Sequence, residues 1–413
     1  MTIGDDIIAS EMLDGNGPGM GPDDGENGEP REISAGLKAF AILSIVSSLI
    51  TVAGAVITVV AVLMNLSAGE TIAQMLGLSE QAIVLHAISL LDSAVLAVLF
   101  IVFGIRILRN QRRHAALITN IMIVFAVLSL ILVLMTRGLL TINAAFSFGV
   151  LVFLIIMHVY LDPQLSDERR LQRKLRSLEA RSDAEEGVLG RDKTGKGYIE
   201  LNFFNLFWIF VVACFLGWLM EMLVCPILNG KIEERAGLLF GPFSPIYGVG
   251  ATLMAMALNR FYKSNPVMIF AVSGVIGATF EFFVSWFFEN AFGILAWDYS
   301  NEPLNLFGRT DLLHGVAWGV LGLVFLRFIL PWLLQLINRI PWNWRYGVTS
   351  VCAVLMVANC FMTLLAFNYW FERASNLPQD TPVAQFYEKH FGDDFMKTRF
   401  SVMSIDPNRV SHS

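Results

Sequence analysis

Long apolar stretches, separated by short segments that are charged or contain Gly and Pro, dominate the pattern along this chain of 413 residues. Most stretches are long enough to cross ~30 Å of hydrocarbon as an α-helix, which rises about 1.5 Å per residue. Polar and apolar residues do not alternate with a period of two, so the chain lacks the pattern of an outer-membrane barrel. We therefore predict an all-α, polytopic helical bundle with about nine transmembrane helices, at residues 37–64, 82–108, 115–136, 139–161, 203–228, 244–261, 266–290, 312–336 and 346–369.

Two of these helices have well-marked starts. Ser244 stands at an N-cap position and is followed by Pro245, which suits the first turn of a helix. Asn265 and Pro266 mark the next helix in the same way. The helix at 244–261 is the shortest of the nine, so a re-entrant or half-membrane helix is an alternative there.

The composition agrees with a membrane protein. The chain is 55% hydrophobic and 15% charged, with a mean hydropathy of +0.60. A soluble protein cannot bury that much apolar surface and keep a charged exterior. The chain shows no nucleic-acid signature, and we predict no cofactor and no metal site. The cysteines have neither CxxC spacing nor nearby His pairs, so we interpret them as small packing residues. They are Cys214, Cys225, Cys352 and Cys360.

Lys and Arg gather in alternate loops, which predicts the orientation of the chain in the bilayer. Basic residues are frequent in the segments 109–113, 162–200, 260–263 and 339–345, whereas residues 65–81 contain none. We therefore predict a multi-pass protein of the cell (plasma) membrane with a cytoplasmic N-terminus. The side on which the C-terminal tail lies depends on whether every predicted helix crosses the membrane.

The distribution of charge predicts five regions. The first is acidic and rich in Gly, which is typical of a disordered tail. In the middle region Leu171, Leu175 and Leu178 recur at helical spacing among charges of both signs. This predicts an amphipathic cytoplasmic helix, lying on the membrane surface or docking a partner. The regions are a tail at 1–35, a four-helix transmembrane domain at 36–161, the charged linker at 162–200, a five-span domain at 201–370 and a C-terminal tail at 371–413.

One segment of the linker nearly spells a phosphate-binding loop. Residues 190–197 contain the required glycines and Lys196, but Gly197 stands where Ser or Thr would hold Mg²⁺. The segment also follows charged linker and not a buried strand. We therefore predict that this chain contains no ATPase of its own.

Ionisable side chains within the predicted spans cost about 3 kcal/mol each at a helix centre, so they are expected to face protein or water. Glu281, Ser285 and Glu289 are spaced at i, i+4 and i+8, which places them on one helical face. The candidate pathway residues are Glu221, Glu281, Ser285, Glu289, Arg309 and His314. Two interpretations stay open: a polar cavity that binds a solute or carries protons, or ion pairs of Glu281 or Glu221 with Arg309 that only fix helix packing.

The first half of the chain contains one counterpart, Asp92, with His86, Ser89 and Ser93 nearby. It could pair with a helix terminus or face the seam between the halves. Small residues indicate close helix contacts elsewhere. They are Gly274 and Gly277 on one helix and Gly315, Gly319 and Gly322 on the next.

From about residue 200 the chain carries several motifs in order. They are Gly217-Trp218 with Glu221; the loop from Gly237 through Gly241-Pro242 to Pro245, Tyr247 and Gly248; Glu281, Ser285, Trp286 and Glu289; Trp297-Asp298-Tyr299-Ser300 with Asn305; Gly308-Arg309; and a closing stretch from Phe386 to Phe400. Together they resemble the CmpB-like family of ABC-transporter type IV permeases. That family has Arg directly before the Gly that opens the Gly-Pro loop, whereas here Ala236 intervenes after Arg235.

The resemblance implies a multi-pass membrane permease, and an ABC-type system implies a separate ATPase subunit as partner. We therefore predict a transport protein whose partners are the lipid bilayer and such an ATPase, with a homo-oligomer left open. The alternatives are a membrane-embedded enzyme acting on a lipid, with paired acids and His314 in acid–base roles, and a scaffold or sensor with no pathway. No known catalytic motif is present, so we favour a protein that is not an enzyme.

Overall fold

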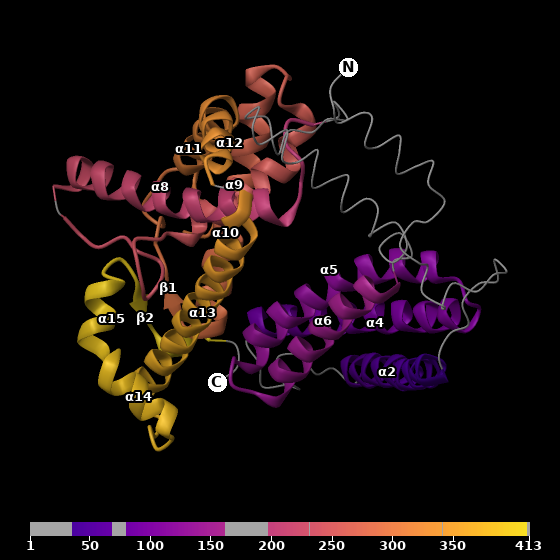
Figure 1. The fold of residues 1–413 in the computed structure, drawn as a ribbon. Helices are drawn as coiled ribbons and strands as arrows, with labels where there is room; N and C mark the ends of the chain where they lie inside the picture. The colour runs from indigo at the N-terminus through magenta and orange to yellow at the C-terminus, as the bar shows by residue number, and fades with distance from the viewer. Residues whose placement is uncertain (1–34, 68–79, 162–196, 231, 341, 411–413) are drawn as a thin grey trace, which may run out of the picture.

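The computed structural model describes residues 35–67, 80–161, 197–230, 232–340 and 342–410. This part of the chain is nearly all α-helical, as predicted, and falls into two groups of helices (Figure 1). The predicted acidic tail and all but the last few residues of the charged linker lie outside the described residues.

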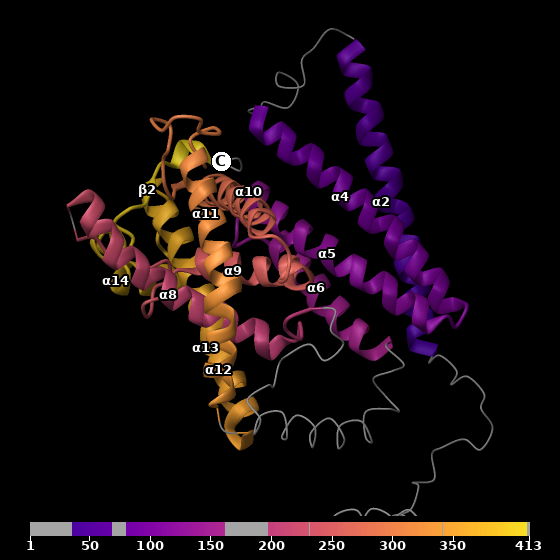
Figure 2. The same ribbon diagram turned by 90° about the horizontal axis from the view of Figure 1, so that it is seen from above.

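The first half is a sequence of antiparallel neighbours. Each helix packs against the next along the chain, and Phe103, Met122 and Leu154 are buried between them. Figure 2 shows α2 crossing α4 and diverging from it toward the end at which the chain passes from one helix to the other. The helices are α2 (Ala35–Ser67), α4 (Glu80–Leu108), α5 (Arg112–Arg137) and α6 (Ile142–Leu161).

The second half is built around α10 and α11, which pack closely through small residues. A side chain at Gly274 would lie 2.9 Å from the carbonyl oxygen of Gly315, and one at Gly277 would collide with Trp318. The predicted small-residue packing face is therefore confirmed. The helices of this half are α8 (Phe203–Asn229), α9 (Pro245–Leu258) with the 3-10 turn η2 (Asn259–Phe261), α10 (Pro266–Phe292), α11 (Leu312–Val324), the π-helical segment η3 (Phe325–Ile329), α12 (Leu330–Asn338) and α13 (Trp342–Ala374).

The residues that follow α13 fold back onto the second half. Aromatic side chains of this segment enter a shared core, in which the Phe367 and Phe400 rings lie 4.8 Å apart. Ile405 pairs with Ile294 in an antiparallel two-stranded sheet. The segment expected as a C-terminal tail is thus folded as far as residue 410. Its elements are α14 (Pro382–His390), α15 (Asp393–Arg399), β2 (Ser404–Ile405) and η4 (Pro407–Arg409), and the partner strand is β1 (Ile294–Leu295).

The two halves meet along α5 and α10. Leu85, Leu132 and Met135 from the first half are buried in the same core as Phe292 at the end of α10. The helix that carries most of the candidate site therefore also forms part of the contact with the first half.

Every predicted span is helical, but the number of nine spans is not confirmed. Among the described residues, seven helices are long and apolar enough to cross a membrane. A further apolar helix, at Ile142–His158 within α6, is shorter than these seven. Helix α9 has 14 residues, which at about 1.5 Å each is too short for ~30 Å of hydrocarbon. This agrees with the half-membrane alternative for the segment 244–261.

The observed helix starts follow from local side-chain chemistry. Asn265 caps α10, with its side chain accepting a hydrogen bond from the Val267 N–H, and Pro266 occupies the first turn. Helix α9 begins at Pro245 directly after Ser244, as predicted. Asp311 caps α11 and accepts a hydrogen bond from the His314 N–H.

Candidate functional site

The polar face of α10 forms the base of the candidate site. Glu281 is 4% exposed, Ser285 1% and Glu289 8%, so all three lie on the side of the helix that the protein covers. The i, i+4, i+8 spacing predicted this shared face. Each of these side chains needs polar partners from another element, because an unpaired polar group buried at this depth is costly.

The loop between α10 and α11 supplies those partners. Gly293, with φ of +62°, ends α10 in the left-handed conformation and starts the loop. The loop then closes on itself: the Trp297 Nε1–H donates to the Arg309 carbonyl at 2.7 Å, and the Tyr299 N–H donates to the Gly308 carbonyl at 2.8 Å. This closure brings the end of the loop back over α10.

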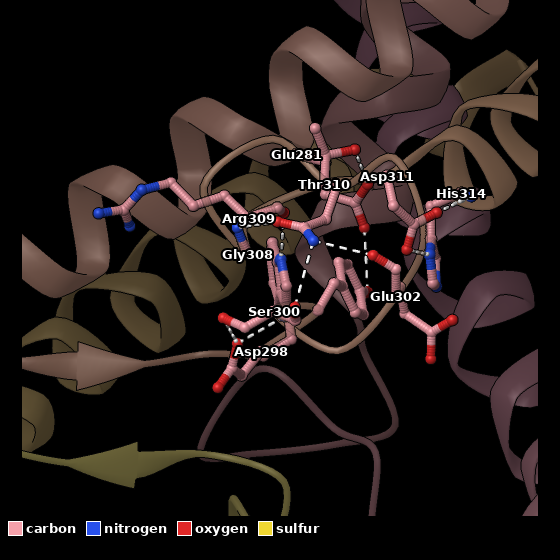
Figure 3. Close-up of polar contacts among 12 residues, drawn as sticks. Glu281, Asp298, Ser300, Glu302, Gly308, Arg309, Thr310, Asp311 and His314 are labelled. Atoms are coloured by element: carbon pink, nitrogen blue, oxygen red, sulfur yellow. Dashed lines mark hydrogen bonds and ion pairs between the residues drawn. The ribbon is translucent and has the colours of Figure 1, made fainter.

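Glu281 accepts hydrogen bonds from two neutral hydroxyl groups (Figure 3). The Tyr299 hydroxyl donates to its Oε1 at 3.2 Å and the Thr310 hydroxyl to its Oε2 at 2.9 Å. No Lys or Arg of the described residues forms an ion pair with it. Its carboxylate is therefore solvated by the protein but is not neutralised by a neighbouring cation.

Glu289 has the opposite environment. It forms an ion pair with Arg309, and the Arg409 Nη1 donates to its Oε1 at 3.0 Å. The Arg309 Nη1 also lies 3.5 Å from the Ser285 hydroxyl. The alternative in which Glu281 or Glu221 pairs with Arg309 is wrong, because the loop closes so that the Arg309 side chain follows α10 toward its C-terminal end.

Asp311 and His314 form a second polar pair beside Glu281. The Asp311 Oδ2 and the His314 Nδ1 are 2.8 Å apart, and the Tyr299 ring stacks on the imidazole with ring centres 4.0 Å apart. The His314 side chain is 36% exposed, whereas that of Asp311 is 1% exposed. His314 is thus the exposed member of the pair and lies beside Asp311 (Figure 3).

The loop side chains differ in their tendency to ionise. Burial, followed by the charge of Glu281, raises the pKa of the Tyr299 hydroxyl, so this group remains a proton donor at neutral pH. Hydrogen bonds from the Ser300 hydroxyl and N–H lower the pKa of Asp298. Asp298 is therefore a constant acceptor that holds the turn, and the Asn305 side chain continues this turn by accepting from the Gly308 N–H at 3.0 Å.

Glu221 is near this cluster but on a different helix. It lies on α8, close to the side chain of Tyr247. The Tyr247 ring in turn packs directly against Gly217, which has no side chain to hold it away. Glu221 and Tyr299 are close enough to interact electrostatically. The structure thus brings Glu221 to the edge of the cluster and not into contact with Arg309.

Side chains of α13 and α15 hold the backbone of the Gly-Pro loop. Gly241 has a φ of +76°, and Pro242 follows it. The Arg399 guanidinium, from the folded C-terminal segment, donates to the Leu238 carbonyl at 2.9 Å and to the Gly241 carbonyl at 2.5 Å. The Asn359 side chain exchanges hydrogen bonds with the backbone of Phe240. This loop therefore joins α8, α13 and α15.

Arg235, which stands one residue before the position expected for it, pairs with a neighbour in its own segment. Its Nη2 lies 3.2 Å from the Glu233 carboxylate. The Trp218 indole donates to Glu234 at 3.0 Å, so the residue before Arg235 is the one held by this tryptophan.

Three residues of the site were not predicted from the sequence. Thr310 could have been found, since it stands between Arg309 and the helix cap Asp311 in the same short segment. Arg399 and Arg409 lie in a hydrophilic stretch far along the chain, and nothing in the sequence links them to Gly241 or Glu289. Contacts over such distances depend on the packing of the whole second half.

Asp92 lies apart from this cluster, buried within the first half. Its carboxylate has no direct hydrogen bond among the described residues, and the polar side chain it approaches is Ser129 on α5. The structure therefore does not place it at a helix terminus. The described residues contain no group of three or more His, Cys, Asp or Glu side chains able to hold a metal ion. The cysteines in this part of the chain are free thiols.

Comparison with known proteins identifies one family. Residues 208–364 match the family model described as "Putative ABC-transporter type IV". This range contains the Gly-Pro loop, the polar face of α10 and the loop that covers it. No curated protein matches the chain, and no solved structure matches it either.

Proposed function

Because residues 208–364 form a region of the ABC-transporter type IV family, we propose that the chain is a permease whose second half contains the transport pathway. The family match and the seven long apolar helices among the described residues support a membrane transport protein. The pathway itself, its substrate and its energy source are the parts that we propose and that the experiments below test.

The different environments of Glu281 and Glu289 carry this proposal. Two arginines neutralise Glu289, which suits a structural ion pair. Glu281 is equally buried but has only hydroxyl donors. A carboxylate at membrane depth without a fixed cation is suited to binding a proton or a cation that comes and goes. We therefore assign Glu281 as the exchangeable acid of the pathway.

The neighbouring groups form a route from Glu281 to the surface. Tyr299 contacts both Glu281 and the ring of His314, and His314 is partly exposed. On the other side, Glu221 and Tyr247 extend the polar region toward α8. Ser285 is covered in this structure, so passage of a solute requires a second, open arrangement of α10 and α11. A sealed scaffold would have no such arrangement.

We expect Glu281→Gln to reduce uptake at least tenfold, because the amide keeps the size of the side chain but cannot exchange a proton or bind a cation. Uptake is measured by mass spectrometry in proteoliposomes supplied with a mixture of small solutes extracted from the producing cells. Glu302→Gln is the control, since Glu302 is an exposed residue of the same loop. Accumulation of no solute by the wild type, or equal uptake by both variants, contradicts the proposal.

The ABC assignment needs a separate ATPase, which we propose to dock on the basic cytoplasmic side, including residues 162–200. The topology proposed here has the N-terminus in the cytoplasm, as the distribution of Lys and Arg predicts. A pull-down in mild detergent, read by mass spectrometry, tests the partner. A stoichiometric ATPase supports an ABC permease subunit, whereas a homo-oligomer or a lone chain removes the ATPase and leaves ion coupling through Glu281 as the energy source.

One observation favours a second candidate, an enzyme acting on a membrane lipid. Two apolar side chains of the loop that leads into the Asp311–His314 pair are exposed: Leu304 is 77% exposed and Phe307 82% exposed, and both have positive φ values. Such a strained and exposed apolar rim suits contact with lipid chains. His314, oriented by Asp311, would then act as general acid or base.

This candidate predicts that His314→Gln abolishes turnover of a lipid. The measurement is chromatography of a radiolabelled total lipid extract after incubation with the protein in mixed micelles. His390→Gln is the control, because His390 is exposed on α14 and distant from Asp311 along the chain. If the wild type forms no lipid product and His314→Gln loses solute uptake, the permease is favoured.

A further inference from the structure

The first half contains a large cavity bounded by α2, α4, α5 and α6. Its volume is about 1490 Å³, above the roughly 300–1,000 Å³ of sites for drug-sized ligands. It lies where α2 diverges from α4 (Figure 2), and none of the described side chains of α2 after Ser48 is buried. None of the residues discussed for the transport pathway lines it.

The cavity is long enough to suit a chain-like ligand. Along α2 its wall runs from Phe40 to Leu63, roughly 35 Å at about 1.5 Å per residue. This length is comparable with the ~30 Å hydrocarbon thickness of a bilayer. Phe40 and Phe153 line one end of the cavity, and the centres of their rings are 4.7 Å apart.

Each helix contributes small polar side chains to the wall, at helical spacing. Many of these hydroxyls already donate to their own backbone: Ser44 to Ala41 at 2.9 Å, and Thr51 to Ser47 at 3.0 Å. A hydroxyl bonded in this way is satisfied without water, so a hydrocarbon chain can lie against it. Examples from the four helices are Ser48 and Thr58 of α2, Ser93 of α4, Thr136 of α5 and Ser147 of α6.

The other end of the cavity is polar and basic. Arg137, in the last turn of α5, lines it together with His86 and Asn143. No Asp or Glu of the described residues lines the cavity, and none of them forms an ion pair with Arg137. A cavity with a basic residue at one end and mainly apolar walls matches a ligand with an anionic head and a long apolar tail.

We propose that this cavity binds an anionic phosphate-headed membrane lipid, with the headgroup at Arg137 and an acyl chain reaching toward Phe40 and Phe153. The position of Arg137 at a helix end agrees with this, because lipid headgroups lie at the level where transmembrane helices end. The site is independent of the transport pathway, so either proposal can fail without the other.

The test uses the full chain in nanodiscs with photo-crosslinkable lipids. One preparation contains phosphatidylglycerol and the other phosphatidylcholine, each with a photoreactive group near the end of an acyl chain, and the labelled peptides are mapped by mass spectrometry. We expect labelling within residues 40–63, 83–100 and 143–153, at least threefold stronger for phosphatidylglycerol. Equal labelling by both lipids, or labelling spread over all lipid-facing residues of α2, overturns the proposal.

Two pairs of variants make the test specific. Arg137→Gln should remove the preference for phosphatidylglycerol, whereas Arg109→Gln, at the opposite end of the helices, should keep it. Gly149→Phe should reduce labelling at least fivefold by filling the cavity, because Gly149 lines it and an added side chain meets open space. Gly54→Phe is the matched control, since Gly54 also has open space but does not line the cavity.

Replacing Gly within a helix raises helix propensity, so neither glycine variant should unfold. If Gly149→Phe nevertheless migrates as an aggregate on size exclusion, the Arg137→Gln comparison decides the question alone. Unchanged lipid preference in Arg137→Gln contradicts the proposal.

Discussion

An Arg309→Ala variant is expected to lose about 3–5 kcal/mol of unfolding free energy, as found when one partner of a buried ion pair is removed. The substitution leaves Glu289 buried at 8% exposure with Arg409 as its remaining cation, and it removes the contact with Ser285. The measurement is denaturant unfolding in detergent micelles, followed by tryptophan fluorescence.

Matched variants separate the ion pair from general damage. Arg409→Ala should cost about 1 kcal/mol or less, because the Arg409 side chain is 45% exposed and its charge is screened by solvent. Combining Arg309→Ala with Glu289→Gln should recover part of the loss, since no buried charge is then left without its partner. Equal effects of the two arginine substitutions would show that Glu289 is less buried than described.

Gly277→Val is expected to lower the unfolding free energy by about 1–3 kcal/mol or more, through overpacking against Trp318. Trp318 also lies against Gly250 on α9, where a side chain would come within 2.8 Å of the indole, so it has little room to move. Helices α10 and α11 must then separate, which withdraws Thr310 from Glu281. The expected functional result is a loss of uptake similar to that of Glu281→Gln.

Gly54→Val on α2 controls for the effect of the substitution on the helix itself, because an added side chain there meets nothing within 4 Å. Thermal unfolding of both variants in the same detergent provides the comparison. Wild-type stability and wild-type uptake in Gly277→Val would mean that the α10–α11 contact is looser than the structure indicates.

The helices were predictable because membrane helices are encoded locally. Apolar length and side chains such as Asn265 and Pro266, which cap and start a helix, suffice to locate them. Crossing the bilayer is less local: α9 has an apolar sequence but only 14 residues, since the chain turns into η2 at Asn259. The number of spans therefore could not be counted from hydropathy alone.

The site was predictable in part for the same reason. The spacing of Glu281, Ser285 and Glu289 along one helix determines that they share a face. Which acid meets Arg309 depends instead on how the loop closes at Gly308, with its φ of +68°. The second cation of Glu289 is Arg409, 120 residues further along the chain. Pairing over that distance follows from tertiary packing and leaves no pattern in the sequence.

The folded C-terminal segment was the largest difference from expectation. Its helices α14 and α15 are short and hydrophilic, so a search for membrane spans does not find them. They are held by a few aromatic residues, such as Phe391 and Phe400, which insert beside Phe367. Single aromatic anchors of this kind are invisible to an average over a window of residues.

The pairing of Glu289 with Arg409 has a consequence for biogenesis. Ribosomes add about 5–20 residues per second, so the roughly 100 residues between Arg309 and Arg409 take about 5–20 s to synthesise. During that interval the nascent chain has already produced Glu289 and Arg309, but it has neither the second arginine nor the strand that pairs with β1. Maturation of this region in the membrane thus finishes only after the last part of the segment has been made, and a nascent chain interrupted before residue 400 would present surveillance proteases with Glu289 held by Arg309 alone and with β1 lacking its partner strand.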